Sequence, residues 1–115
     1  MIGPTYFGGV SALSTSDFIR INGFSNEYWG WGGEDDDLYR RLGYHNMTVT
    51  RPDPLDLARY TMLSHKKAKP NPDRFMKLNM AKGRANSDGL ANLEYLGMQL
   101  VLKHMYTHIL VDIRP

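Results

Sequence analysis

Hydrophobic positions change their spacing several times along the chain, and these changes predict three helices. The apolar positions within 18–21 follow a run of capping residues and predict a short helix that ends at Asn22–Gly23. Apolar residues one turn apart predict a second helix from Glu34 to about Leu42, with four acids at its start, where they favour the helix dipole. A third helix is expected to open at Asn71–Pro72, because proline is favoured in a first turn.

Alternating and β-branched residues predict strands between and after these helices. The expected strands are residues 6–13, interrupted by two glycines, 47–50, 60–65, 93–104 and 109–113. A helix is the alternative for 93–104, and residues 87–89 predict a turn. Because helices and strands alternate along the chain, the fold class is α/β or α+β.

Composition then narrows the class of protein. The chain has 115 residues, 42% of them apolar, so it can form one small domain or part of a larger one. Its net charge of +2 is too small to indicate that the protein as a whole attracts nucleic acid electrostatically. The absence of cysteine excludes a disulfide framework, a thiolate metal site and a cysteine nucleophile within this segment. The longest apolar stretch is too short to span a bilayer, and no signal-peptide pattern follows Met1.

The strongest candidate chemistry lies in one segment, Trp29-Gly30-Trp31-Gly32-Gly33-Glu34-Asp35-Asp36-Asp37. Indole rings beside glycines can form a platform on which the C–H face of a sugar packs, while carboxylates bind its hydroxyls. A ligand site is therefore one interpretation. The other is that both tryptophans anchor a core and that the acids only begin a solvated helix.

Helix geometry separates the four acids. Two of them have arginine partners one turn later: Asp36 with Arg40, and Asp37 with Arg41. Glu34 shares the Leu38 face and is expected to point toward the core side. Asp35 faces Tyr39 and has no cationic partner on its own helix, so it is a candidate general base whose pKa would rise on burial. The alternative is that Asp35 only stabilises the helix N-terminus.

His65 and the basic segment 66–84 are weaker candidates. On a regular strand Met62 and His65 would face opposite sides, and a thioether is a poor ligand for a hard divalent ion, so chemistry alone makes Met62 a core residue. The basic segment contains seven basic residues and one acid, Asp73. It could bind phosphate or an anionic partner, but a solvated face is the simpler interpretation. With Phe75 as its only aromatic residue, it gives nucleic-acid binding little support.

Several motifs, taken together, resemble the β-1,4-galactosyltransferase family. They occur in family order and cover nearly the whole chain: Tyr6-Phe7-Gly8-Gly9-Val10-Ser11-Ala12-Leu13-Ser14, Asn22-Gly23-Phe24, the run from Tyr28 to Asp37, Met62-x-x-His65, Pro70-Asn71-Pro72-x-Arg74-Phe75, Ser87-Asp88-Gly89-Leu90 and Val111-Asp112-Ile113. The Trp/Gly/acid motif is highly specific, so the resemblance is not carried by one loose pattern.

The resemblance implies that residues 1–115 form the C-terminal, acceptor- and metal-side part of a glycosyltransferase-A-like α/β catalytic domain, a mixed sheet with flanking helices. It implies a Mn²⁺-dependent type II Golgi membrane enzyme with a lumenal catalytic domain. This enzyme would transfer galactose from UDP-galactose, with inversion, to the 4-hydroxyl of a terminal N-acetylglucosamine or glucose on a glycoconjugate. Membrane attachment would come only from an anchor absent from this chain, and no nucleic-acid partner is expected.

Residue roles also follow from the resemblance. Asp35 would be the base that deprotonates the acceptor hydroxyl. Glu34 and Asp36 would bind sugar hydroxyls, and Trp31 would lie between donor and acceptor in a mobile loop. Tyr6 and Gly9 would line the donor site, and the acceptor N-acetyl pocket would contain Arg74, Phe75 and Leu78. Met62 and His65 would be ligands of Mn²⁺. The metal role contradicts the chemical argument on Met62. Tyr6 favours galactose, because similar enzymes that prefer UDP-GalNAc carry a smaller aliphatic residue there.

One departure from the family changes the expected activity. The family's Asp-x-Asp metal and nucleotide motif lies upstream of the matching region and is absent here, so this chain alone is expected to transfer little or no galactose. The alternative function is a non-catalytic sugar-binding or regulatory module that retains the acceptor site. A phosphate-binding domain that uses the basic segment 66–84 is a third, weaker hypothesis.

Overall fold

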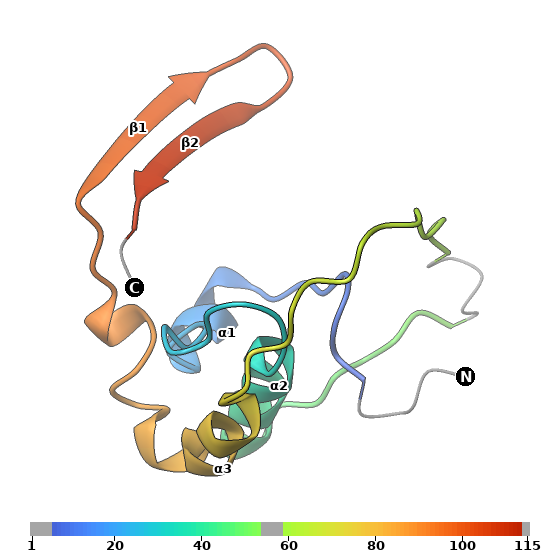
Figure 1. The fold of residues 1–115 in the computed structure, drawn as a ribbon, viewed down its shortest axis with the longest axis vertical. Helices are drawn as coiled ribbons and strands as arrows, with labels where there is room; N and C mark the ends of the chain where they lie inside the picture. The colour runs from blue at the N-terminus through green and yellow to red at the C-terminus, as the bar shows by residue number, and fades with distance from the viewer. Residues whose placement is uncertain (1–5, 54–58, 114–115) are drawn as a thin grey trace.

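The structure is a computed structural model that describes residues 6–53 and 59–113. Its elements are helices α1 (Thr15–Arg20), α2 (Glu34–Tyr44) and α3 (Arg74–Arg84), the short 3-10 helix η2 (Leu90–Asn92), and strands β1 (Gly97–Leu102) and β2 (Thr107–Asp112). The α-helices lie together, and the two strands form a hairpin that projects away from them (Figure 1). This combination confirms the predicted class, a mixed α/β arrangement.

Helix α1 begins and ends where the sequence predicts. Ser14 is its N-cap, and the Ser14 hydroxyl accepts a hydrogen bond from the Asp17 amide at 3.0 Å, which satisfies an otherwise unpaired donor. After the helix, Asn22 and Gly23 have φ of 62° and 65°, a left-handed conformation that ends helical progression. Ile21, between the helix and this stop, is only 1% exposed. The short helix therefore delivers one apolar side chain to the core.

Helix α2 contributes the centre of the core. Leu38 and Leu42, one turn apart as predicted, form a buried cluster with Ile21. Partly buried side chains from the flanking segments pack against this cluster: Phe7, Leu13, Met47 and Val49. Helix α2 also packs against α3, whose Leu78 and Ala81 are buried. These contacts fix the acidic start of α2 relative to α3.

Strands β1 and β2 pair in antiparallel register, with Gly97 opposite Asp112 and Leu102 opposite Thr107. Both strands are exposed along their whole length. The hairpin nevertheless carries many apolar side chains: Met98, Leu100, Val101, Leu102, Ile109, Leu110 and Val111. The structure confirms the strand interpretation of residues 93–104 over the helical one, although the strand itself is shorter. The second strand begins two residues earlier than predicted.

Three other predicted strands are wrong. Residues 6–13 bend at Gly9, whose φ of 102° interrupts an extended run. Residues 47–50 form no ladder with any described segment, and their alternation instead turns Met47 and Val49 toward the core cluster. Residues 60–65 likewise pair with no described strand. A strand needs a neighbour that satisfies its backbone groups, and alternation alone does not supply one.

Helix α3 begins at Arg74, slightly later than predicted, because the residues before it form a turn of their own. In that turn the Asn71 side-chain oxygen accepts a hydrogen bond from the Asp73 amide at 2.9 Å. The predicted turn at residues 87–89 is confirmed and follows the end of α3. Within the described ranges, none of the helices combines the length and apolar character that crossing a membrane requires.

Candidate acceptor-side site

The aromatic loop, residues 28–33, is anchored at its first residue. The Tyr28 hydroxyl donates a hydrogen bond to Asp37 Oδ2 at 2.9 Å. The Tyr28 ring lies against Gly33, where an added Cβ would be 2.7 Å from Tyr28 Cε1. The three loop glycines have φ between 85° and 103°, values that other residues rarely adopt. Glycine is therefore required here both for the backbone and, at Gly33, for space.

The aromatic loop is joined on its other side to the segment before α3. The Asn71 amide donates to the Trp31 carbonyl at 2.9 Å, and Trp31 and Pro70 form an isolated parallel bridge. The Lys77 ammonium donates to the Glu27 carbonyl at 2.5 Å. Two motifs that lie far apart in the sequence are thus held side by side.

Arg74 lies between two aromatic rings. Its guanidinium carbon is 5.9 Å from the centroid of Trp31 and 4.4 Å from that of Phe75, within the range of cation–π contacts. The Arg74 Nη1 also donates to the Asn71 carbonyl at 2.9 Å, which orients the side chain. Trp31 and Phe75 remain 56% and 64% exposed, so this stack presents aromatic surface to solvent. The structure therefore brings Trp31, which the resemblance implies between donor and acceptor, together with two residues implied for the acceptor N-acetyl pocket.

Asp35 differs from the other acids of the run by its surroundings. It is half-buried, and its Oδ1 accepts a hydrogen bond from the Asp36 amide at 2.9 Å. Its Oδ2 lies beside Gly8, and the Tyr6 hydroxyl approaches the same glycine. In the described part of the chain, Asp35 has no ion-pair partner. One carboxylate oxygen of Asp35 is thus free of hydrogen-bond donors from the described residues.

Two predictions for α2 are wrong. Glu34 is exposed rather than directed at the core, because it lies at the helix end, one turn beyond the buried leucines. Arg40 does not pair with Asp36 but donates to the Leu78 carbonyl at 2.6 Å. Packing between α2 and α3 thus replaces the expected local pair. Glu34 and Asp36 are both exposed at the start of α2, where they can contact a ligand.

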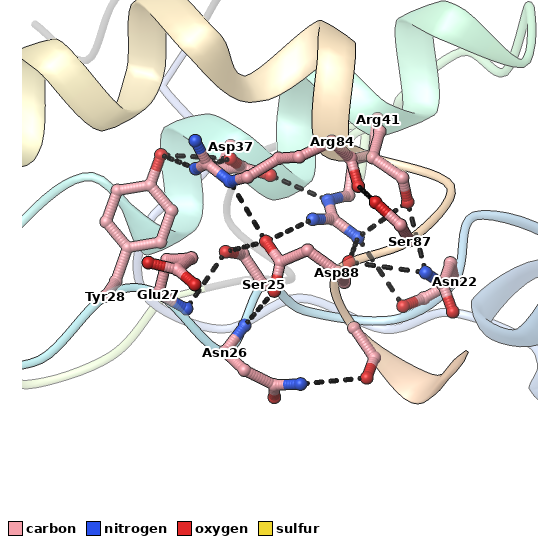
Figure 2. A network of polar contacts seen from close by, with 12 residues as sticks. Asn22, Ser25, Asn26, Glu27, Tyr28, Asp37, Arg41, Arg84, Ser87 and Asp88 are labelled. Atoms are coloured by element: carbon pink, nitrogen blue, oxygen red, sulfur yellow. Dashed lines mark hydrogen bonds and ion pairs between the residues drawn. The ribbon is translucent and has the colours of Figure 1, made fainter. Parts of the chain in front are cut away.

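Beneath the aromatic loop lies a buried network of two acids and two arginines, which Figure 2 shows from close by. Arg41 contacts Asp37 Oδ1 at 2.7 Å and Asp88 Oδ2 at 3.3 Å. Arg84 contacts the same two carboxylates, at 3.1 Å and 3.0 Å. Each buried charge has opposite charges beside it, which matters because an unpaired buried charge is very costly. In the described part of the chain, every buried side-chain nitrogen and oxygen has a hydrogen-bond partner.

Asp88 connects this network to the segment that leads into the aromatic loop. Its carboxylate accepts hydrogen bonds from the Ser25 hydroxyl and, at 2.8 Å, from the Asn26 amide. Burial by itself raises the pKa of Asp88, but the Ser25 and Asn26 hydrogen bonds, with Arg84 and Arg41, outweigh it and lower the pKa below its usual 3.8. The carboxylate is therefore ionised at neutral pH and fixes the start of the loop.

Arg84 connects the network to Tyr28. Its guanidinium lies over the Tyr28 ring at 5.5 Å and donates to the Tyr28 hydroxyl at 3.0 Å. Burial, together with the neighbouring Asp37 carboxylate, raises the pKa of Tyr28 to about 12. Sequence reasoning found the Asp37–Arg41 pair but missed Arg84 and Asp88. Their spacing of one helical turn was the only local signal available.

The remaining implied site residues are not brought together by the described residues. Met62 is 85% exposed, and the His65 Nδ1 lies 3.2 Å from the Leu63 carbonyl. Within the described ranges, no group of three or more His, Cys, Asp or Glu side chains gathers as a metal site would require. Gly9 is exposed with open space around its Cα. Leu78 is 5% exposed, buried on α3 where Arg40 of α2 reaches its carbonyl.

Comparison with known proteins identifies the family. The family model described as the N-terminal domain of galactosyltransferase matches residues 2–66, more than half of the chain, so the chain belongs to the galactosyltransferase family. It is 47% identical over 115 residues to β-1,4-galactosyltransferase 2 of Cricetulus griseus, a match that covers 96% of this chain and 31% of that protein. It is 49% identical over 111 residues to β-1,4-galactosyltransferase 1 of Bos taurus, covering 94% and 27%. The chain thus spans only 27–31% of the length of these curated relatives.

A solved structure agrees with this assignment. The chain resembles the catalytic domain of Drosophila β-1,4-galactosyltransferase 7, crystallised in complex with xylobiose, with a TM-score of 0.52 and 25% sequence identity. The match covers 84% of this chain and 44% of that one. The fold is therefore that of part of a galactosyltransferase catalytic domain.

Proposed function

We propose that this chain forms the acceptor side of an inverting β-1,4-galactosyltransferase, with Asp35 as its catalytic base. The observation that carries the proposal is the joining of the aromatic loop to the start of α3. The Trp31–Arg74–Phe75 stack lies beside the acidic start of α2, because Arg74 Cβ would be 3.3 Å from a Cβ added at Gly33, the N-cap of that helix. An apolar sugar face can pack on the rings, while Glu34 and Asp36 can bind hydroxyl groups.

In the proposed reaction, the acceptor is a terminal N-acetylglucosamine or glucose and the donor is UDP-galactose. The acceptor 4-oxygen forms a bond to the galactose anomeric carbon as the bond from that carbon to the diphosphate breaks. The proton of the 4-hydroxyl passes to the Asp35 carboxylate, whose Oδ2 accepts no hydrogen bond from the described residues. Attack opposite the leaving diphosphate gives inversion.

The family resemblance also suggests Mn²⁺, which would offset charge on the leaving diphosphate. The side chains of the described residues do not make a Mn²⁺ site by themselves. Met62 supplies a soft thioether, a poor match for a hard ion, and both Met62 and His65 are exposed. The proposed role of Asp35 does not depend on the metal.

Cellular location is also a proposal that rests on the family. We propose a Golgi enzyme with a lumenal catalytic domain. We also propose that residues 1–115 alone transfer little or no galactose, because the chain spans only 27–31% of the length of these relatives. Strong UDP-galactose turnover by residues 1–115 would contradict this.

The test is Asp35→Asn in the full-length protein, with Glu94→Gln as a control that also removes one exposed carboxylate. We expect Asp35→Asn to lower kcat by about a hundredfold to ten-thousandfold, because the base is lost while shape is kept. Thermal stability and acceptor binding should persist, and Glu94→Gln should behave as the unmodified protein. Near-normal turnover by Asp35→Asn would contradict the role of Asp35. Acceptor binding by the unmodified protein without any transfer would support the alternative function, a non-catalytic sugar-binding module.

A further inference from the structure

Gly8 occupies the position on which the candidate base side chain packs. A Cβ added at Gly8 would overlap Asp35 Oδ2, and it would lie 3.1 Å from the Tyr6 hydroxyl oxygen and 3.3 Å from Tyr6 Cζ. These are the two side chains that the proposed function places at the acceptor hydroxyl and at the donor. Both side chains therefore lie close to the space that a side chain at position 8 would occupy.

The backbone at Gly8 does not itself call for glycine. Gly8 is absent from the residues with positive φ, whereas its neighbour Gly9 has a φ of 102°. An alanine at position 8 would thus avoid the strain of a left-handed backbone. What the position cannot accommodate is side-chain volume next to the Asp35 carboxylate.

Packing of the preceding residue, Phe7, holds Gly8 close to α2. The Phe7 ring lies 5.9 Å from the ring of Tyr39, which is one helical turn after Asp35 on the same face of α2. Phe7 also packs against the buried cluster of the core. These contacts of Phe7 oppose movement of the segment away from α2, so a larger residue at position 8 is expected to displace the Asp35 carboxylate.

We propose that Gly8 is a positioning residue for the transfer reaction: the absence of a side chain allows the Asp35 carboxylate to occupy its reactive position next to Tyr6. The inference rests on the proposed function, because it assigns Gly8 a role through Asp35. The acidic motif alone does not reveal this requirement, which concerns the segment that contains Gly8. Position 8 must have no side chain because of the space that Asp35 needs, and not because of a left-handed backbone.

The test is Gly8→Ala in the full-length protein, with Gly43→Ala as the matched control. Gly43 lies on the same helix as Asp35, has no positive φ and has open space where an added Cβ would lie. We measure kcat and both KM values for UDP-galactose and N-acetylglucosamine, together with the thermal midpoint. We expect Gly8→Ala to lower kcat about a hundredfold, the effect of displacing a reacting group by about 1 Å, with both KM values and the midpoint nearly unchanged. Gly43→Ala should keep the original kcat.

Two results would overturn the inference. One is a kcat within threefold of the unmodified protein. The other is a loss of activity accompanied by a lower thermal midpoint or by an equal rise in both KM values, which would show general disturbance of the fold. Asp35→Asn, measured in parallel, separates this inference from the proposed function. If Asp35→Asn is inactive and Gly8→Ala is fully active, only the role of Gly8 is wrong; if Asp35→Asn is active, the proposed function itself is wrong.

Discussion

Arg41 Nε lies 2.7 Å from Asp37 Oδ1, and both side chains are completely buried. The two residues are one helical turn apart on α2, but the contact is more than a local pair. Arg41 Nη1 also donates to the carbonyl oxygens of Gly23 at 3.3 Å and Asp88 at 2.7 Å. A single guanidinium thus joins α2 to the end of α1 and to the turn after α3.

Replacing this guanidinium by an apolar group of similar length should strongly destabilise the protein. Arg41→Met leaves two buried carboxylates with Arg84 as their remaining cation, and breaking a buried charge pair costs about 3–5 kcal/mol. The free energy of unfolding by urea is the measurement. Lys82→Met, which removes an exposed cation from α3, should change it by no more than about 0.5 kcal/mol. Equal effects of the two substitutions would show that the Arg41 network contributes nothing special.

The lowered pKa of Asp88 predicts a specific loss of stability in acid. Because the pKa is lower in the folded than in the unfolded chain, the carboxylate contributes stability above about pH 4, the ordinary aspartate range. This contribution decreases as the pH falls through the folded pKa. Asp88→Asn should therefore be less stable than the unmodified protein at pH 7 and should lose less stability between pH 5 and pH 2. The measurement is the free energy of unfolding of both proteins at several pH values in this range. An equal decrease with falling pH in the two proteins would contradict the prediction.

Alanine substitutions at two glycines with the same φ can distinguish the cost of backbone strain from the cost of a side-chain clash. Gly9 and Gly33 both have φ of 102°, but the Cβ of Gly9 would meet open space, while that of Gly33 would lie 2.7 Å from the Tyr28 ring. Gly9→Ala should cost only the backbone strain, about 1–2 kcal/mol. Gly33→Ala should cost more, because it also pushes Tyr28 away from Asp37. Unfolding free energies of the two variants give the comparison, and a cost for Gly33→Ala no larger than for Gly9→Ala would contradict the packing of Tyr28 on the loop.

Tyr6→Leu should raise the use of UDP-GalNAc relative to UDP-galactose in the full-length protein. A phenol ring near the donor C2 substituent leaves little room for an acetamido group, and specificity often comes from such repulsion. The measurement is kcat/KM for each donor, with Tyr95→Leu as a control at an exposed tyrosine outside the site. If Tyr6 were only a packing residue, its replacement would lower both values together, and an unchanged ratio would remove the argument for a galactose donor.

Local features of the chain were readable from the sequence. The Ser14 cap and the Asn22–Gly23 stop define α1, and the leucine spacing with the acidic run defines α2, because these signals act within one or two turns. The motifs also sufficed to suggest the family. Strand predictions succeeded only at the hairpin, where two segments close in the sequence pair with each other.

Contacts between distant segments were decided only by the tertiary structure. No local spacing joins Arg84 to Asp37, Asn71 to the Trp31 carbonyl, or Gly8 to the Asp35 carboxylate. Burial explains the first two contacts, because Asp37 and Asn71 are buried, whereas the third is set by the packing of Asp35 against Gly8. A buried charge must find an opposite charge, and a buried backbone group must find a hydrogen bond, wherever in the chain the partner lies. The sequence by itself determined the chemical groups of the candidate site, whereas packing between α2, α3 and the aromatic loop determined which of them meet.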